Sequence, residues 1–320
     1  MAIPTNTVVT ANQIGRREDL VEAIYQISPE QTPFLSAAVR VKATGILHEW
    51  QTDALEAAAE NRKIEGDDAT ANTFNPTVRL NNHTQISSKT ISVSRTSRAV
   101  NAAGRADEFS YQLSQKGKEL KLDMEFALVR EQASSAGSGT VSRASAGLES
   151  WLASNKTSVG TGTAQTTPGF ASGAVVSPTD STVTGAFTKA SLDDVIQKCW
   201  SSGGNPTEIM CGPTQRVAIS GFSGISTLQT PASPDSAVTL MGAVDFYKSN
   251  FGTLRVVPSR VQRDRTVLVL DMDFVAVAML DDMTMEPLGK TGDSDKTLLV
   301  AEFCLEMKNE AASGKVTDCT

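Results

Sequence analysis

The longest regular pattern of hydrophobic positions in this chain runs from Asp107 to Gln132. Apolar residues recur there at three- and four-residue spacing, which predicts one face of an amphipathic helix. That face carries Phe109, Leu113, Leu120, Met124 and Leu128, and it is widened by Leu122, Phe126 and Val129. Asp107 is a suitable N-cap, and Glu108 and Arg130 match the charges of the helix ends. At 1.5 Å per residue the helix would be about 40 Å long.

Upstream of this helix, an alternation of apolar and polar residues predicts two strands, Gly45–Thr52 and Thr84–Ser94. The residues between them are few in apolar groups and rich in charge, so we predict a hairpin with a long polar tip. A solvated flap is one interpretation. The other is an arm that reaches over a neighbouring subunit, because a lone two-stranded ribbon is marginal in water and gains most from docking. The candidate contact residues are Trp50, Glu60, Arg62, Lys63, Glu65, Asp67 and Asp68.

The N-terminal region contains no pattern of its own for a packed core. Residues 1–16 are polar and predict an arm, followed by a short amphipathic helix over Arg17–Ile27. A second short helix is expected from Pro33, with Thr32 as its cap, since proline is favoured at the first helical position.

Downstream of the long helix, residues 134–188 are rich in Ser, Thr, Gly and Ala, which is typical of loops. One amphipathic segment, Leu148–Leu152, interrupts them. Gly160 and Gly162 lack the third glycine and the preceding strand of a dinucleotide-binding motif.

The part of the chain after residue 188 predicts a small α/β lobe and a closing strand. A capped helix begins at Ser191, a short strand covers Glu208–Cys211, and a further helix begins at Pro213. A hairpin over 244–257 turning near Asn250 and a pair of buried strands over 266–270 and 274–280 follow. Leu298–Lys308 alternates strictly, which predicts a half-buried strand in a sheet alongside the long helix.

Composition narrows the classes of function. The chain has 29 Lys+Arg against 36 Asp+Glu, a net charge of −7, and no basic block, so it is a poor candidate for tight nucleic-acid binding. No apolar run is long enough to span a membrane, and no signal peptide is evident. Four widely separated cysteines without a C-x-x-C motif indicate reduced thiols.

The catalytic motifs in the sequence are incomplete. Gly289-Lys290-Thr291 lacks the first glycine of a phosphate-binding loop, and Gly221-Phe222-Ser223-Gly224 has Ile225 where a nucleophile elbow needs glycine. The chain has two histidines and no Cys/His cluster with zinc-ligand spacing. Asp271 and Asp273 form a D-x-D pattern after an apolar strand, which could hold a divalent ion in a transferase or simply form a turn. We therefore expect no catalytic residue, cofactor or metal.

Several segments of the sequence resemble one family over nearly the whole chain. They are SPEQTPFLSA (28–37), HEWQTDAL (48–55), DVIQKCWSSGGNPTEIMCGP (194–213), FGTLRVVPSR (251–260), VLVLDMDFVAVAML (267–280) and KTGDSDKTLLVAEFCLEMKNEAASGK (290–315). Their number and order resemble the major capsid proteins of tailed double-stranded-DNA bacteriophages, in particular a subfamily like that of phage SU10. That resemblance implies the α+β Hong Kong 97-type capsid fold.

The resemblance also implies a division of the chain and a function. The expected parts are an N-terminal arm (1–40), an extended hairpin loop (41–95), a peripheral domain (96–189) with a spine helix (107–132) and the insertion 134–188, an axial domain (190–265), and strands returning to the peripheral domain (266–320). Copies of the chain would form hexamers and pentamers of an icosahedral shell around DNA, assembled in the host cytoplasm, with portal, scaffolding and decoration proteins as further partners. An encapsulin-like compartment is the nearest alternative, and a metal-dependent transferase using Asp271 and Asp273 is the alternative from another class.

Overall fold

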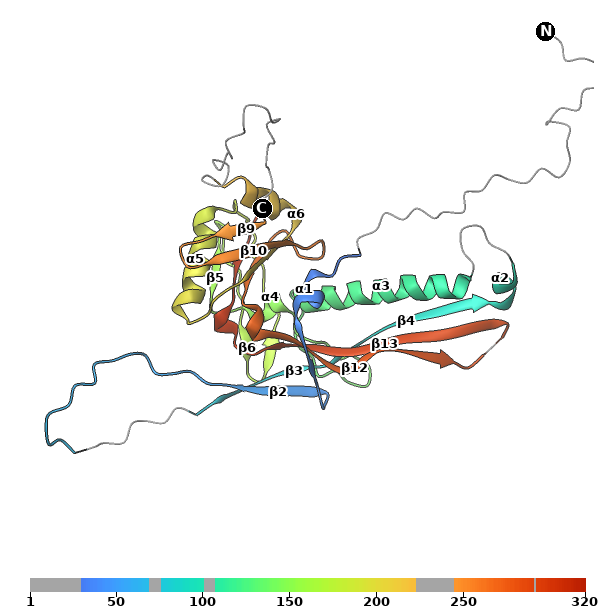
Figure 1. The fold of residues 1–320 in the computed structure, drawn as a ribbon, viewed down its shortest axis with the longest axis horizontal. Coiled ribbons are helices and arrows are strands. Elements are labelled where there is room, and N and C mark those ends of the chain that lie inside the picture. Colours follow the sequence, from blue (N-terminus) through green and yellow to red (C-terminus); the bar gives the residue numbers. More distant parts are fainter. Residues whose placement is uncertain (1–29, 69–75, 101–106, 223–244, 291) are drawn as a thin grey trace, which may run out of the picture.

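The computed structural model describes residues 30–68, 76–100, 107–222, 245–290 and 292–320. The chain forms an elongated α+β molecule with a long helix over a long sheet, a second lobe at one end, and a loop that projects beyond both (Figure 1). Residues 1–29 of the predicted arm (1–40), which include the predicted helix 17–27, lie outside the described residues, as does Ser223.

The first lobe is built on a four-stranded sheet in the order β1-β12-β13-β4. The strands are β1 (Val39–Lys42), β12 (Val275–Leu288), β13 (Ser294–Met307) and β4 (Gln85–Ser94). Helix α3 (Glu108–Val129) lies along one face of β4 and β13 (Figure 1). Leu120, Met124 and Leu128 of the helix share one buried core with the sheet residues Phe303 and Leu305.

The predicted long helix is confirmed, with three differences. Asp107 is the N-cap, and its carboxylate accepts hydrogen bonds from the backbone N–H groups of Phe109 and Ser110, both at 3.2 Å. The helix ends at Val129 rather than Gln132. Phe126 is 50% exposed, so its prediction as a core residue is wrong. The reason is geometric, because residues two apart do not share a helix face and Phe126 lies two from both Met124 and Leu128. Glu125 is buried although the helical pattern did not select it.

The predicted hairpin forms with a different second strand. β2 (Leu47–Thr52) pairs antiparallel with β3 (Val78–His83), which the prediction had placed within the polar tip. The strand predicted over 84–94 does exist as β4, but it joins β13 instead. Alternation identifies a strand with one buried face and carries no information on its partner. Here Ile91 and Val93 of β4 are buried in the first-lobe core that also contains α3 residues.

The second lobe contains a six-stranded sheet in the order β5-β14-β11-β8-β10-β9. Its strands are β5 (Lys156–Ser158), β14 (Gly314–Thr317), β11 (Val267–Leu270), β8 (Glu208–Cys211), β10 (Thr253–Pro258) and β9 (Phe246–Lys248). The predicted hairpin is β9–β10, and the two predicted helices are α5 (Lys189–Ser201), capped by Thr188, and α6 (Pro213–Ser220). Leu192, Val195 and Ile209 are among the buried residues of a second, separate core.

The second-lobe sheet takes strands from outside residues 190–265 as well as from within them. β5, β11 and β14 come from ranges expected in the peripheral domain, yet all three join the second-lobe sheet. The strands expected as a pair are both buried but separate, since β11 pairs with β8 and β14 while β12 pairs with β1 and β13. A 3-10 turn, η2 (Met272–Phe274), redirects the chain between the two sheets.

The insertion 134–188 is mostly loop, as predicted, and it is anchored in the core. Its elements are the short helix α4 (Leu148–Trp151) and the two-stranded hairpin β6 (Gly169–Ala171) and β7 (Ala174–Val176), besides β5. Leu148, Trp151 and Leu152 are buried in the first-lobe core. The remaining short helices are α1 (Pro33–Ala37), α2 (Arg95–Ala99) and η3 (Glu310–Ala312).

Candidate assembly site

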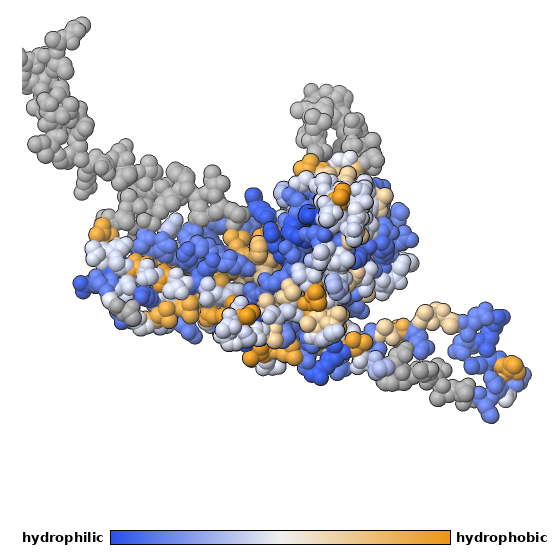
Figure 2. All heavy atoms as spheres, turned by 180° about the vertical axis from the view of Figure 1, so that it is seen from behind, coloured by the Kyte–Doolittle hydropathy of each residue, from blue (hydrophilic) through white to orange (hydrophobic). Residues whose placement is uncertain are grey.

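A long exposed segment of the described chain is the loop between β2 and β3, residues 53–77, which we call the projecting loop. The structure describes 53–68, 76 and 77 of it, and every one of these residues is exposed. In Figure 2 the described part of the loop has a mainly hydrophilic tip, joined to the body by a weakly hydrophobic stretch. Leu55 is 99% exposed and Ile64 is 82% exposed, so the loop buries neither of these side chains against its own domain.

The structure brings six of the seven candidate contact residues together on the projecting loop. They are Glu60, Arg62, Lys63, Glu65, Asp67 and Asp68. Arg62 and Glu60 form an ion pair at 2.8 Å between two highly exposed side chains. Such a pair contributes little to stability in water. The loop therefore presents charges to solvent without using them to hold its own conformation.

The seventh candidate, Trp50, lies in the ribbon rather than on the loop. Its indole Nε1 donates a hydrogen bond to the carbonyl oxygen of Met307 at 2.9 Å, and its ring lies 5.5 Å from that of Trp151. The indole N–H and the ring of Trp50 are therefore already engaged in contacts within the chain. The exposed candidate surface therefore consists of the six residues of the projecting loop.

The end of the β2–β3 ribbon that meets the sheet, which we call the ribbon base, is fixed by buried polar groups. His48 Nε2 lies 2.8 Å from the carboxylate of Glu306. Asn82 is fully buried, donates to the carbonyl oxygen of Leu305 at 2.7 Å and accepts from Ala146 N at 2.9 Å. Burial and the nearby Arg143 guanidinium lower the pKa of His83. Sequence analysis missed Asn82, since a polar residue in a strand gives no sign of whether it faces water or a buried carbonyl.

The arm enters the first lobe through a buried carboxylate. Glu125 of α3 accepts hydrogen bonds from the backbone N–H groups of Phe34 and Leu35, at 2.9 and 2.7 Å, in the first turn of α1. Thr32 stands at the N-cap position, as predicted, but its side chain makes no capping bond. Burial raises the pKa of Glu125, against the effect of its two N–H donors. The sequence offered one signal for this contact, which was the carboxylate of Glu125 among the apolar residues of the helix.

A second buried charge cluster joins the insertion to both lobes. The Arg263 guanidinium pairs with Glu149 of α4, with Asp180 at 2.8 Å and with Glu131 after α3 at 3.1 Å. Beside them, the buried Lys315 ammonium donates to the carbonyl oxygen of Glu149 at 2.7 Å, and burial lowers the pKa of Lys315 to about 8. These residues are far apart in sequence, so no local motif could have predicted the cluster.

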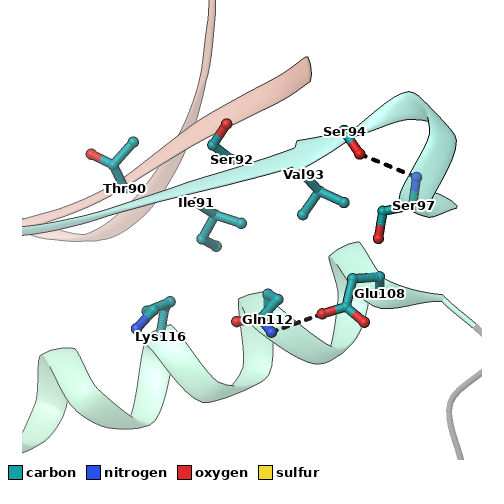
Figure 3. A pocket seen from close by; sticks show the side chains of 9 residues that line it. All are labelled: Thr90, Ile91, Ser92, Val93, Ser94, Ser97, Glu108, Gln112 and Lys116. Atoms are coloured by element: carbon teal, nitrogen blue, oxygen red, sulfur yellow. Dashed lines mark hydrogen bonds between the residues drawn. The ribbon is translucent and has the colours of Figure 1, made fainter. Parts of the chain in front are cut away.

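A groove between β4 and the N-terminal half of α3 has no catalytic constellation in its lining (Figure 3). Ile91 and Val93 point from the strand towards the helix. Glu108 accepts a hydrogen bond from Gln112 at 2.8 Å, and Ser94 caps α2 by accepting from Ser97 N at 3.1 Å. The lining supplies no nucleophile with an adjacent base.

The Asp271–Asp273 pattern forms a structural turn. Asp271 is buried, and its carboxylate accepts from Asn205 N at 3.0 Å and from Asp273 N at 3.2 Å, which caps η2. Among the described residues, no group of three His, Cys, Asp or Glu side chains could hold a metal ion, and no helix is long and apolar enough to cross a membrane. All four cysteines are free and buried.

Comparison with known proteins decides the class. The family model of the SU10 major capsid protein matches residues 3–320. The chain belongs to this family. It is a structural capsid protein and not an enzyme, so the resemblance seen in the sequence is confirmed and the transferase hypothesis is wrong. The major capsid protein of Escherichia phage Phieco32 is 38% identical over 134 residues, which cover 42% of this chain and 38% of that relative.

Solved structures share the fold across the whole chain. The capsid protein of cyanophage A-1(L) superposes with a TM-score of 0.70 at 12% identity, covering 95% of this chain and 97% of that one. The SrpI encapsulin of Synechococcus elongatus PCC 7942 superposes with a TM-score of 0.56 at 14% identity, covering 100% and 96%. The chain therefore has the Hong Kong 97-type fold predicted from its sequence.

Proposed function

We propose that copies of this capsid protein form hexamers and pentamers of an icosahedral shell that encloses a double-stranded DNA genome. The observation that carries the proposal is the projecting loop, in which every side chain of the described residues 53–68, 76 and 77 remains exposed on the single chain. A segment that buries so little on its own gains stability when a neighbour covers it. The net charge of −7 suits a container that encloses DNA without binding it tightly.

In this proposal the projecting loop lies over a neighbouring subunit of the shell. Its charged residues would form ion pairs across the interface, namely Glu60, Arg62, Lys63, Glu65, Asp67 and Asp68. Its apolar contacts would come from Leu55 and Ile64. The interfaces between subunits would then carry much of the stability, so the isolated subunit should be less stable than the assembled one.

The parts of the chain receive the following roles in the proposal. The predicted arm (1–40) leads into β1, and within the predicted loop range (41–95) the β2–β3 ribbon and the projecting loop act as the extended loop. The first lobe, with α3 and with β4 from that range, acts as the peripheral domain. The second lobe, which includes β5, β11 and β14 besides most of 190–265, acts as the axial domain near the capsomer centre. Portal, scaffolding and decoration proteins are the further partners, and assembly takes place in the host cytoplasm.

Deletion of residues 55–75 tests the proposal. We expect the deleted subunit to keep its fold by circular dichroism and to form capsomers, while electron microscopy shows no closed shells. A variant of full length with Leu55→Ser and Ile64→Ser separates the apolar contacts from the length of the loop, and we expect it to close shells less efficiently. Normal closed particles from the deletion variant would contradict the interlocking role.

An encapsulin-like compartment is the second candidate, since the fold is shared with an encapsulin. The content of purified particles separates the two. Packaged genomic DNA supports the phage shell, whereas a single cargo enzyme without DNA supports the compartment.

A further inference from the structure

Four aromatic side chains from three separate segments form a continuous row at the ribbon base. The rings of His48 and Trp50, both on β2, lie 5.6 Å apart. Trp50 lies 5.5 Å from Trp151 of α4, which in turn stacks on Phe170 of β6 at 5.8 Å with the ring planes 1° apart. The last two residues belong to the insertion 134–188, so the row connects the insertion to the ribbon that carries the projecting loop.

The backbone connects this ribbon directly to the four-stranded sheet through one strand only, since Thr84 alone separates β3 from β4. β2 and β3 form a separate two-stranded sheet, and neither strand pairs with a strand of the four-stranded sheet. A lone two-stranded ribbon is marginal in water and needs packing against other elements. Apart from the continuation of β3 into β4, the orientation of β2–β3 relative to the body therefore depends on side-chain contacts at its base.

Much of that contact comes from the insertion. Trp151 is almost completely buried, and Phe170 and Trp50 are partly buried against the same core. On the other strand of the ribbon, the amide nitrogen of Asn82 donates to Ser145 Oγ at 3.2 Å, while its amide oxygen accepts from Ala146 N at 2.9 Å. Both strands of the ribbon are thus held by residues of 134–188.

Phe170 is itself held in place by a tight hairpin. β6 and β7 pair antiparallel, with Phe170 opposite the buried Val175. The two turn residues, Ser172 and Gly173, have positive φ angles of 52° and 83°. Positive φ at both central positions is the geometry of a two-residue turn that matches the twist of the paired strands. Ser134 anchors this hairpin to the exit of α3, since its Oγ accepts from Val175 N at 2.8 Å.

We propose that the insertion 134–188 is the positioning element of the projecting loop. Phe170 and Trp151 act as positioning residues that set the direction in which the β2–β3 ribbon leaves the body, so that the loop meets its neighbour in one orientation. The inference rests on the proposed role of the loop in the shell, and it assigns a function to the segment with the least distinctive sequence.

The test measures the direction of the ribbon in unassembled subunits. Spin labels are attached at Asp53→Cys, directly after β2, and at Lys189→Cys on α5, and the distribution of distances between them is recorded by pulsed electron resonance. The four native thiols are buried and their pKa values are raised to about 12 by burial, so the labels go to the introduced positions. Phe170→Ala is compared with the parent protein and with Phe251→Ala. The control removes a ring that lies 5.2 Å from Trp200 in the second lobe, away from the ribbon.

We expect Phe170→Ala to broaden the distance distribution at least twofold, while Phe251→Ala leaves it unchanged. If Phe170→Ala does not fold, Phe170→Leu keeps most of the volume and removes the stacking, and the same broadening is expected to a smaller degree. An unchanged distribution in a folded Phe170 variant would overturn the inference.

Shell formation by the same variants separates this inference from the proposed function. A broadened distribution together with malformed or open shells supports both. A broadened distribution with normal closed shells supports the positioning role and contradicts the need for an oriented loop in assembly.

Discussion

Glu125 is a single carboxylate that holds the point where the arm joins the body. It is buried, and it is the acceptor for the first-turn N–H groups of Phe34 and Leu35. Glu125→Ala leaves two buried donors without this acceptor, so we expect the free energy of unfolding to fall by about 1–3 kcal/mol. Denaturant titration of the purified subunit measures it. Glu119→Ala on the same helix removes a partly exposed pair with Lys116 and should change stability by less than about 1 kcal/mol. Equal effects of the two substitutions would contradict the role of Glu125.

The buried Lys315 makes the free energy of unfolding depend on pH in the alkaline range. Burial lowers its pKa to about 8 from the ordinary value of 10.5. Between these two pKa values the unfolded chain binds the proton and the folded chain does not. The free energy of unfolding therefore rises as pH increases from about 8 to 10.5, and this gain is lost when pH falls back to about 8. From pH 8 to 10.5 we expect the unfolding free energy of the parent protein to rise by about 3 kcal/mol relative to that of Lys315→Met, which has no titrating group at this position. Titrations at a series of pH values measure the difference. A gap that stays constant would show that Lys315 remains charged in the folded protein.

At the scale of elements, α3 contains a glycine in its interior that the fold does not require. A Cβ added at Gly117 meets no atom within 4 Å. Glycine in a helix interior is destabilising relative to alanine, so we expect Gly117→Ala to raise the free energy of unfolding by about 0.5–1 kcal/mol. Gly147, the N-cap of α4, is the control, because its Cβ would lie 2.0 Å from the carbonyl oxygen of Arg130. Gly147→Ala should therefore destabilise the protein. Destabilisation by Gly117→Ala would indicate that α3 must bend at this position.

At the scale of the whole molecule, the thiols report on both lobes. Cys199, Cys211 and Cys319 lie in the second core, and Cys304 of β13 packs in the first lobe in a small cluster with Ala278 of β12 and Ala43, which follows β1. Burial raises the pKa of each to about 12, so at pH 8 roughly one thiol in ten thousand is the reactive thiolate. We expect a water-soluble thiol reagent to modify the native subunit only as fast as it unfolds, and Lys63→Cys on the projecting loop to react at once. Rapid reaction of one native thiol would identify the lobe that opens first.

The correct and incorrect sequence predictions differ in a systematic way. Asp107, the stripe Leu120–Met124–Leu128 and the short helix at Pro33 were predicted because helices depend on neighbours within four residues. The partner of 84–94 and the sheet of 266–270 were wrong, because alternation reports burial and not pairing. Asn82, Glu125 and the Arg263 cluster were missed, since their partners lie dozens of residues or more away in the chain.

The sequence by itself determined the longer helices, most of the longer strands, the family and the Hong Kong 97-type fold. Local periodicity and the order of similar segments can be recognised without knowing which residues are in contact. Only the tertiary structure decided which strands share a sheet, how the arm is capped, and that the Ser- and Gly-rich insertion supports the ribbon base. Those outcomes depend on contacts between distant residues, and a buried carboxylate or indole has the same letter in the sequence as an exposed one.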